Sequence, residues 1–267
     1  RDESVLDMSD EQVRALRGDR IAMIFQDPMT SLNPVFRVGY QIAEALRLHK
    51  GMDRKAAAAR AVEMLELVGI PNAAHRARDY PHQFSGGMRQ RGMIAMALAC
   101  DPDILIADEP TTALDVTIQA QILELMIEMQ QRTGAAIIMI THDLGVVADM
   151  ADKVMVMYAG KQVEYGTADE VFYEPRHPYT WGLLDSLPRH DIDEKGILMP
   201  IEGQPPSLID VPSGCAFHPR CPYAKDICSS ESPVLRAVDG EHLAACHFTD
   251  DPGFRRGEAK PNGEARA

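Results

Sequence analysis

The sequence lacks any long apolar run. Its longest uninterrupted apolar stretches, residues 93–99 and 135–140, fall far short of the roughly eighteen residues that a membrane-spanning helix needs. Positive charge is also scarce, because 27 Lys and Arg stand against 40 Asp and Glu, for a net charge of −13. A nucleic-acid-binding surface normally shows clustered basic residues. We therefore expect a chain without transmembrane helices and without a nucleic-acid partner.

What the sequence does contain is the pattern of an α/β fold. Three short apolar runs rich in Ile, at residues 21–25, 104–107 and 136–140, predict parallel strands buried on both faces. Between the last two, apolar residues of the stretch 117–132 recur at three- and four-residue steps, which predicts a helix that Gly134 ends. These segments make a strand-helix-strand unit.

The remaining segments suggest how the chain is organised. The Ala- and Leu-rich stretch 38–68 predicts two helices that break near residues 51–53. They would belong to a helical subdomain of about residues 38–100. Residues 154–158 and 162–165 predict a β-hairpin that closes the domain.

The composition changes near Pro188, where Pro, Gly and Cys become frequent. We therefore place one domain at residues 1–188 and a Cys-containing extension at residues 189–249. Residues 250–267 are rich in Gly, Pro, Glu and Arg and have little to bury, which predicts a disordered tail.

Two carboxylates, Asp108 and Glu109, directly follow the apolar run at 104–107. They would lie at the carboxyl edge of a parallel sheet, where open α/β folds bind ligands. In a nucleotide-hydrolysing site Asp108 would hold Mg²⁺ and Glu109 would polarise the attacking water. Taken alone, two acids at a strand end are equally typical of ordinary strand termination.

A second candidate site is Ser85-Gly86-Gly87, which precedes a helix running to about Ala99. A serine hydroxyl and bare backbone amides at a helix N-terminus form an anion site. The alternative is an ordinary N-cap followed by glycines. His142 and Gln26, each just after a predicted strand, could reach a γ-phosphate or the attacking water, or could be simple surface residues.

In combination these motifs resemble those of the ATP-binding-cassette (ABC) ATPases. In order they are Gln26 (Q-loop), Ser85-Gly86-Gly87 (signature), Asp108-Glu109 (Walker B), Ala113-Leu114-Asp115 (D-loop) and His142 (switch histidine). Longer stretches at residues 25–34, 80–91 and 177–180 resemble the ATPase subunits of dipeptide and oligopeptide importers. The expected fold is a P-loop NTPase-like α/β nucleotide-binding domain with a helical subdomain and a Cys-containing C-terminal extension.

The resemblance implies a dimer of two cassettes that sandwich ATP and Mg²⁺. Ser85, Gly86 and Gly87 would contact nucleotide held by the partner. The residues expected to serve the chain's own site or its D-loop are Gln26, Asp108, Glu109, Asp115 and His142. The partner would be a second, related ATPase, beneath two transmembrane permease subunits supplied by a peptide-binding protein. The chain would lie at the cytoplasmic face of the bacterial inner membrane as a peripheral subunit.

One motif of the family is missing. A phosphate-binding P-loop requires Gly-x-x-x-x-Gly-Lys-Ser/Thr, and no stretch of the sequence has this spacing. The sequence also opens in mid-pattern with Arg1, so we expect it to be truncated before the Q-loop. As printed, the chain should hydrolyse little or no ATP, because the triphosphate loses most of its positioning.

Two other functions fit parts of the pattern. A non-catalytic partner subunit would suit the missing P-loop, although such a subunit has no use for Glu109 and His142. A DNA-repair ABC ATPase with metal modules would need a basic surface and Cys-x-x-Cys pairs, and the sequence has neither.

Four cysteines cluster after the predicted cassette. Cys215, Cys221, Cys228 and Cys246 are separated by five, six and seventeen residues. Clustered cysteines in a cytosolic protein favour metal over disulfides. Without a Cys-x-x-Cys pair, four thiolates could hold an iron-sulfur cluster, and some peptide-importer ATPases that this chain resembles carry a 4Fe-4S cluster in this region.

Two alternatives to the cluster stay open. One is a set of reduced, partly buried cysteines without metal. The other is a mixed zinc site that uses His218, His242 or His247.

Overall fold

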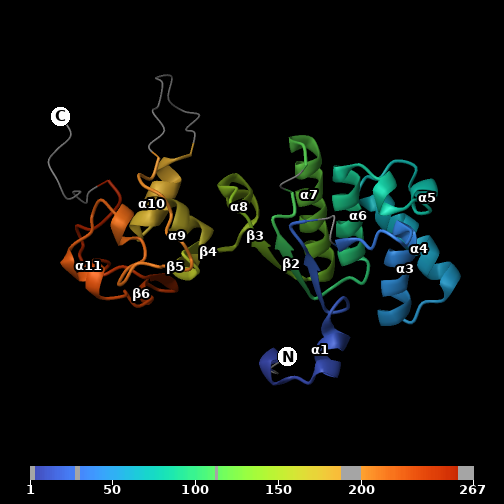
Figure 1. Ribbon diagram of the computed structural model, residues 1–267, viewed down its shortest axis with the longest axis horizontal. Coiled ribbons are helices and arrows are strands. Elements are labelled where there is room, and N and C mark those ends of the chain that lie inside the picture. The colour runs from blue at the N-terminus through green and yellow to red at the C-terminus, as the bar shows by residue number, and fades with distance from the viewer. Residues whose placement is uncertain (1–3, 28–30, 112–113, 188–199, 258–267) are drawn as a thin grey trace. The chain divides into compact units, whose positions relative to one another are not determined.

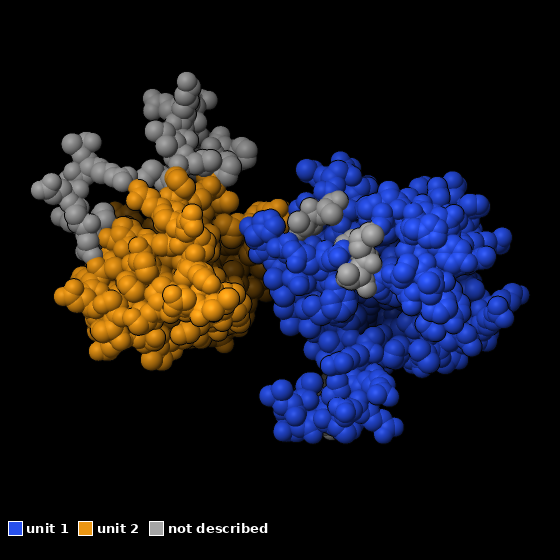
Figure 2. Space-filling view, in the orientation of Figure 1, with its two compact units in different colours: residues 1–142 blue, residues 143–267 orange. Residues whose placement is uncertain are grey.

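A computed structural model describes residues 4–27, 31–111, 114–187 and 200–257. The chain divides into two compact units, residues 1–142 and residues 143–267 (Figures 1 and 2). Among the described residues, no helix combines the length and the apolarity that a membrane crossing requires.

The first unit is built on a three-stranded parallel sheet with the order β1-β2-β3 (Figure 1). The strands are β1 (Ile21–Ile24), β2 (Ile104–Asp108) and β3 (Ala136–Ile140). Ile24 lies beside Ala107, and Asp108 lies beside Ile140. All three predicted strands are present, and β2 lies between the other two. The carboxyl ends of β2 and β3 are therefore neighbours.

Among its described residues, this unit also contains six α-helices and two short 3-10 helices. They are 3-10 helices Val5–Asp7 and Pro81–Gln83, and helices α1 (Asp10–Leu16), α3 (Val38–His49), α4 (Arg54–Leu67), α5 (Ala73–Arg76), α6 (Gly86–Leu98) and α7 (Val116–Thr133). The predicted break between α3 and α4 is confirmed, and Asp53 caps α4 by accepting from the N–H groups of Lys55 and Ala56 at 2.8 and 3.0 Å. Gly134, with φ +70°, ends α7 as predicted.

The prediction that the strands are buried on both faces is wrong for the described chain. Ala22, Leu105 and Ala107 are buried on one face, which α6 approaches at β1. On the other face Met23 and Ile138 are exposed. Along each strand, less exposed and more exposed positions alternate, as they do where one face of a sheet is packed more closely than the other. An apolar run by itself does not reveal whether one or two faces are covered.

The second unit contains a four-stranded antiparallel sheet with the order β4-β5-β7-β6 (Figure 1). Its elements are α8 (Leu144–Met150), β4 (Lys153–Tyr158), β5 (Lys161–Thr167), α9 (Ala168–Tyr173), α10 (Pro178–Asp185), a 3-10 helix His218–Arg220, α11 (Asp226–Ser230), β6 (Arg236–Asp239) and β7 (His242–Ala244). The predicted hairpin is confirmed. Its turn residues Ala159 and Gly160 both have positive φ, at 48° and 75°, which suits the twist of the two strands.

The core of the second unit joins the hairpin to the Cys-containing region. Val156, Tyr158 and Val163 pack in one buried cluster with Phe217. The rings of Tyr158 and Phe217 meet edge to face with centroids 5.2 Å apart. The hairpin and the segment around Phe217 therefore share one core.

The compact units and the predicted domains divide the chain at different places. The predicted boundary near Pro188 falls in residues 188–199, outside the described residues, and stays a prediction. Most of the predicted tail, from residue 258 on, is also outside them. Within its described part, Phe254 packs against Trp181 with ring centroids 5.1 Å apart, so a portion of the expected tail has folded contacts.

Candidate functional site

The first unit brings the predicted catalytic side chains together at the carboxyl edge of its sheet. Gln26 Nε2 donates to Glu109 Oε2 at 2.9 Å, and His142 Nδ1 lies 3.1 Å from Glu109 Oε1. Three residues that are far apart in the sequence thus meet because β1, β2 and β3 are neighbouring parallel strands. The His142 side chain is 74% exposed and that of Glu109 is 23% exposed, so the group opens to solvent.

The backbone at Glu109 is unusual. Its φ of 45° lies in the left-handed region, which costs a residue with a Cβ about 1–3 kcal/mol. The Glu109 N–H donates to the carbonyl oxygen of Ile140 at 2.9 Å. This bond continues the pairing of β2 with β3 by one residue and turns the chain sharply at the point where the carboxylate is presented. Such strain at a strand end is typical of functional sites.

Asp108 is the last residue of β2 and is partly exposed. Its side chain makes no hydrogen bond or ion pair with another residue in the described part of the chain. The carboxylate is therefore available to a cation at the same sheet edge as Glu109. Oxygen ligands of this type suit Mg²⁺, which usually keeps several of its waters.

Ser85 lies at the N-cap of α6, where its hydroxyl accepts from the Met88 N–H at 3.3 Å. The helix is 13 residues long, and Ser85 and Gly86 are exposed. A Cβ on Gly86 would meet nothing within 4 Å, and one on Gly87 would lie 3.4 Å from the Leu114 side chain. The N-terminus of α6 thus presents backbone amides to open space, which suits an anion.

Asp115, the D-loop candidate, caps α7 by accepting from the Ile118 N–H at 3.1 Å. Its predicted neighbour Ala113 lies outside the described residues. The N-cap interpretations of Ser85 and Asp115 and the nucleotide-binding interpretation are compatible, because a capping oxygen at an exposed helix start remains reachable from solvent.

The four clustered cysteines line one small cavity in the second unit. Cys215, Cys221, Cys228 and Cys246 surround a volume of about 20 Å³, enough for one water. Burial raises the pKa of Cys221 to about 12 and that of Cys246 to about 11, and the neighbouring thiols add to both shifts. The predicted grouping of the four thiols is therefore present.

The geometry does not support a single metal ion at this cavity. In the part of the chain that the structure describes, no three His, Cys, Asp or Glu side chains are arranged to hold one. His242, one of the histidines considered for a zinc site, is instead buried against Glu164, with Nε2 2.9 Å from Oε1. His247 Nε2 lies 2.9 Å from the carbonyl oxygen of Glu231. The mixed Cys/His zinc alternative is therefore not supported.

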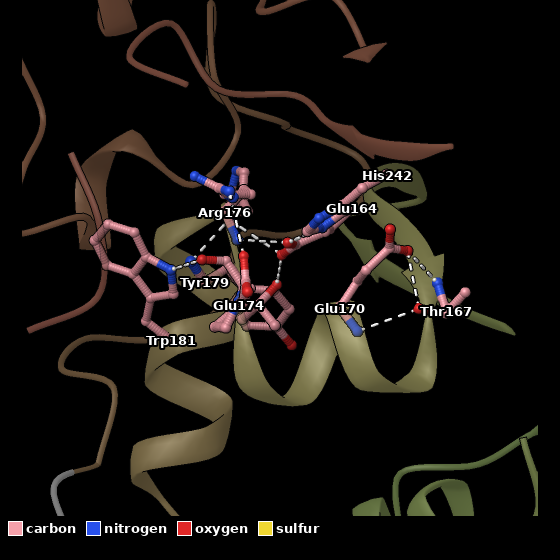
Figure 3. Close-up of polar contacts among 11 residues, drawn as sticks. Glu164, Thr167, Glu170, Glu174, Arg176, Tyr179, Trp181 and His242 are labelled. Atoms are coloured by element: carbon pink, nitrogen blue, oxygen red, sulfur yellow. Dashed lines mark hydrogen bonds and ion pairs between the residues drawn. The ribbon is translucent and has the colours of Figure 1, made fainter. Parts of the chain in front are cut away.

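The contact of His242 belongs to a buried polar cluster that the sequence did not indicate (Figure 3). Glu164 is fully buried and also accepts from the Thr180 hydroxyl and from the backbone N–H groups of Arg176 and His177. These donors come from β7 and from the start of α10. The cluster joins three segments of the second unit around one carboxylate, and a lone glutamate within a strand gave no sequence signal for it.

Comparison with known proteins decides the family. Residues 3–112 match the ABC transporter family, and residues 163–228 match the oligopeptide/dipeptide transporter C-terminal region. The chain is 56% identical over 243 residues to the dipeptide transport ATP-binding protein DppD of Bacillus subtilis, an alignment that covers 91% of this chain and 72% of that protein. The chain belongs to the peptide-transporter branch of the ABC ATPases.

Other members of this branch and a solved cassette agree with the assignment. The oligopeptide transport ATP-binding protein OppD of Salmonella typhimurium is 55% identical over 242 residues, covering 91% of this chain and 72% of that protein. A solved dimeric structure of the ATP-binding cassette MJ0796 with ADP and Pi is 27% identical, with a TM-score of 0.56 over 61% of this chain and 68% of that one. The ABC ATPase fold predicted from the motifs is thereby confirmed.

Proposed function

We propose that this ABC ATPase is the ATP-hydrolysing, energy-coupling subunit of an importer for dipeptides or oligopeptides. The observation that carries the proposal is the contact of Gln26 and His142 with the two carboxylate oxygens of Glu109. The proposal that peptides are the cargo comes from the relatives, because DppD and OppD are named as dipeptide and oligopeptide transport proteins. Acidic composition and the missing Cys-x-x-Cys pairs leave the DNA-repair alternative without support.

The proposed chemistry divides between the residues of the sheet edge. Glu109 accepts a proton from the attacking water, and Gln26 and His142 fix the direction of its carboxylate and approach the γ-phosphate. Asp108 would hold Mg²⁺, which would supply neutralisation of charge on the phosphates. Asp115 supports the nucleotide from the start of α7. Each of these groups opens to solvent at the same end of the parallel sheet.

We further propose that the chain works in a pair of cassettes. Ser85, Gly86 and Gly87 would bind the phosphates of nucleotide that a second, related ATPase holds, which fits an exposed anion site at the start of α6. The dimeric structure of MJ0796 supports such pairing. The pair would lie peripherally at the cytoplasmic face of the membrane, on two permease subunits that a peptide-binding protein supplies.

For the cysteine cavity we propose a 4Fe-4S cluster held by Cys215, Cys221, Cys228 and Cys246. Four thiols around one cavity are the donor set that such clusters use, and an electropositive centre would bring down the raised pKa values of Cys215, Cys221 and Cys246. A cavity of about 20 Å³ must widen to accept the cluster.

The hydrolysis proposal is tested with Glu109→Gln in a transporter assembled from its partners and a form of this subunit that carries a P-loop, because the printed sequence has none. The amide keeps the shape of the side chain but cannot accept the proton, so ATP should still bind and the cassettes should still pair, while turnover falls at least about a hundredfold. The matched control is Glu124→Gln on the exposed side of α7, which should leave turnover unchanged. Undiminished hydrolysis in Glu109→Gln would remove Glu109 from the role of base.

The cluster proposal is tested by iron and sulfide analysis of protein purified without oxygen. Wild-type protein should be coloured and contain both elements, and Cys221→Ser should lose them. Cys100→Ala, which removes the cysteine of the first unit, should keep them. A colourless, iron-free wild-type protein would leave four reduced thiols as the correct description.

A further inference from the structure

Gln90 connects the helix that carries the signature serine to the turn that carries Glu109. It lies in the second turn of α6 and is 1% exposed. Its Nε2 donates to the carbonyl oxygen of Pro110, the residue directly after Glu109. Because Pro110 is itself buried, this carbonyl is shielded from water and needs a protein donor. Gln90 supplies it.

The turn at Glu109 is held from two sides. On one side the Glu109 N–H is bonded to Ile140 of β3, and on the other side Gln90 of α6 holds Pro110. Glu109 has a left-handed φ of 45°, which persists only where surrounding contacts over-determine it. The direction of the carboxylate follows from this backbone. A change at Gln90 therefore acts on the position of the proposed base without touching it.

The other end of the connection is the anion site of α6. Ser85 caps this helix, and Gly87 in its first turn packs close to Leu114. Within a helix, Ser85 and Gln90 move together as one rigid element. Any displacement of the helix start toward or away from bound phosphate is therefore carried to Pro110 and to the turn at Glu109.

The contact also differs from ordinary core packing. Gln90 Oε1 is buried and has no hydrogen-bond partner among the described residues. Burying an amide oxygen without a partner costs about 1–3 kcal/mol, and an apolar side chain of the same length would avoid this cost. Of the two polar atoms of this side chain, only the donor Nε2 has a hydrogen-bond partner among the described residues.

We propose that Gln90 is a positioning residue that couples the phosphate site at Ser85 to the orientation of Glu109 within one chain. The inference rests on the proposed function, in which Ser85 serves the nucleotide held by the partner and Glu109 serves the nucleotide held by this subunit. Through Gln90, occupancy of one nucleotide site adjusts the base of the other.

The first test is Gln90→Met in the assembled transporter, because methionine keeps the length and removes the donor. Turnover of ATP should fall about ten- to a hundredfold, as expected for a misplaced catalytic group, while the KM for ATP changes little. Gln121→Ala, an exposed glutamine on α7, is the matched control and should keep wild-type turnover. Wild-type turnover in Gln90→Met would overturn the inference.

A double-mutant comparison separates positioning from stability. If Gln90 acts through Glu109, Gln90→Met should add no further loss to the residual turnover of Glu109→Gln. A loss of the same factor in both backgrounds would show a merely structural effect and overturn the inference. If Glu109→Gln itself keeps full turnover, the proposed function fails, so the two failures are distinguishable.

Gln90→Glu provides a second variant in case Gln90→Met does not fold. Burial keeps a glutamic acid protonated at pH 6, and its O–H can donate to the Pro110 carbonyl as the amide does. At pH 6 the ratio of variant to wild-type turnover should be higher for Gln90→Glu than for Gln90→Leu, which has no donor. Equal ratios for these two variants would overturn the inference.

Discussion

His142 and Glu109 meet across the ends of two neighbouring strands, with His142 Nδ1 3.1 Å from Glu109 Oε1. Glu109 directly follows β2, and His142 follows β3 after a single intervening residue. The register that places Asp108 beside Ile140 makes this contact possible. The imidazole contacts the carboxylate through Nδ1, and the rest of its largely exposed ring can be reached by a γ-phosphate.

His142→Ala should reduce ATP turnover in the assembled transporter about a hundredfold while ATP still binds. The reason is that Glu109 loses one of the two contacts that direct its carboxylate, and the phosphate loses a neighbouring donor. Turnover and nucleotide binding are measured in parallel. His75→Ala, at an exposed position in α5, should behave as wild type. Equal turnover in both variants would contradict a role for His142.

Ser85→Ala should lower turnover and also weaken the start of α6, because the side chain both caps the helix and faces the anion site. The loss of an N-cap costs about 1 kcal/mol of stability. Ser85→Asn keeps a capping oxygen, so it should restore the stability but not the turnover. Thermal unfolding and hydrolysis are compared for the two variants. Full turnover in Ser85→Asn would show that Ser85 acts only as a cap.

Glu164→Gln should destabilise the second unit by about 3 kcal/mol, because an amide cannot accept from all four donors that surround the carboxylate. The single Trp of the chain, Trp181, is buried in this unit, and its Nε1 donates to the Pro175 carbonyl oxygen at 2.8 Å (Figure 3). Its fluorescence therefore follows unfolding of this unit alone.

The matched control for this measurement is Glu241→Gln. Glu241 is an exposed acid in the same unit and pairs with Lys153, and exposed ion pairs contribute little. The unfolding midpoint of the Glu241→Gln variant should stay close to that of the wild type. Similar midpoints for Glu164→Gln and Glu241→Gln would show that the buried cluster contributes no more than a surface pair.

Gly214→Ala should loosen the cysteine cavity. The added Cβ would clash with the Cys228 carbonyl oxygen, and φ at Gly214 is +70°. Gly240→Ala is the control, since its φ of +51° is also left-handed but nothing lies within 4 Å. The control should lose only the about 1–2 kcal/mol of backbone strain, and Gly214→Ala should lose more and expose its thiols to alkylation. Equal losses of stability in the two variants would mean that the backbone around Cys228 moves away from the added methyl group without cost.

Much of the cassette could be predicted from the sequence because the information is local. Apolar runs predicted β1, β2 and β3, the break at residues 51–53 separated α3 from α4, and Ser85 marked the start of α6. The approach of His142 to Glu109 also followed from sequence, since residues after neighbouring parallel strands share one sheet edge. Short-range patterns and one rule of topology were sufficient for these features.

Other features depend on contacts between distant residues. Gln90 stands in a helical stretch where nothing in the pattern distinguishes it from a surface glutamine, and only the packing of α6 on the turn at Glu109 brings it to Pro110. His242 is a residue of a type that often binds metal, but its place in β7 brings its side chain against Glu164 instead.

The sequence by itself determined the order of the motifs, the strands and helices that carry them, and hence the family. Only the tertiary structure decided which face of the first sheet is covered, what Gln90 and His242 contact, and that four cysteines share one cavity. The physical reason is that periodicity and capping act over a few residues, whereas burial and hydrogen-bond partners are set by segments tens of residues apart.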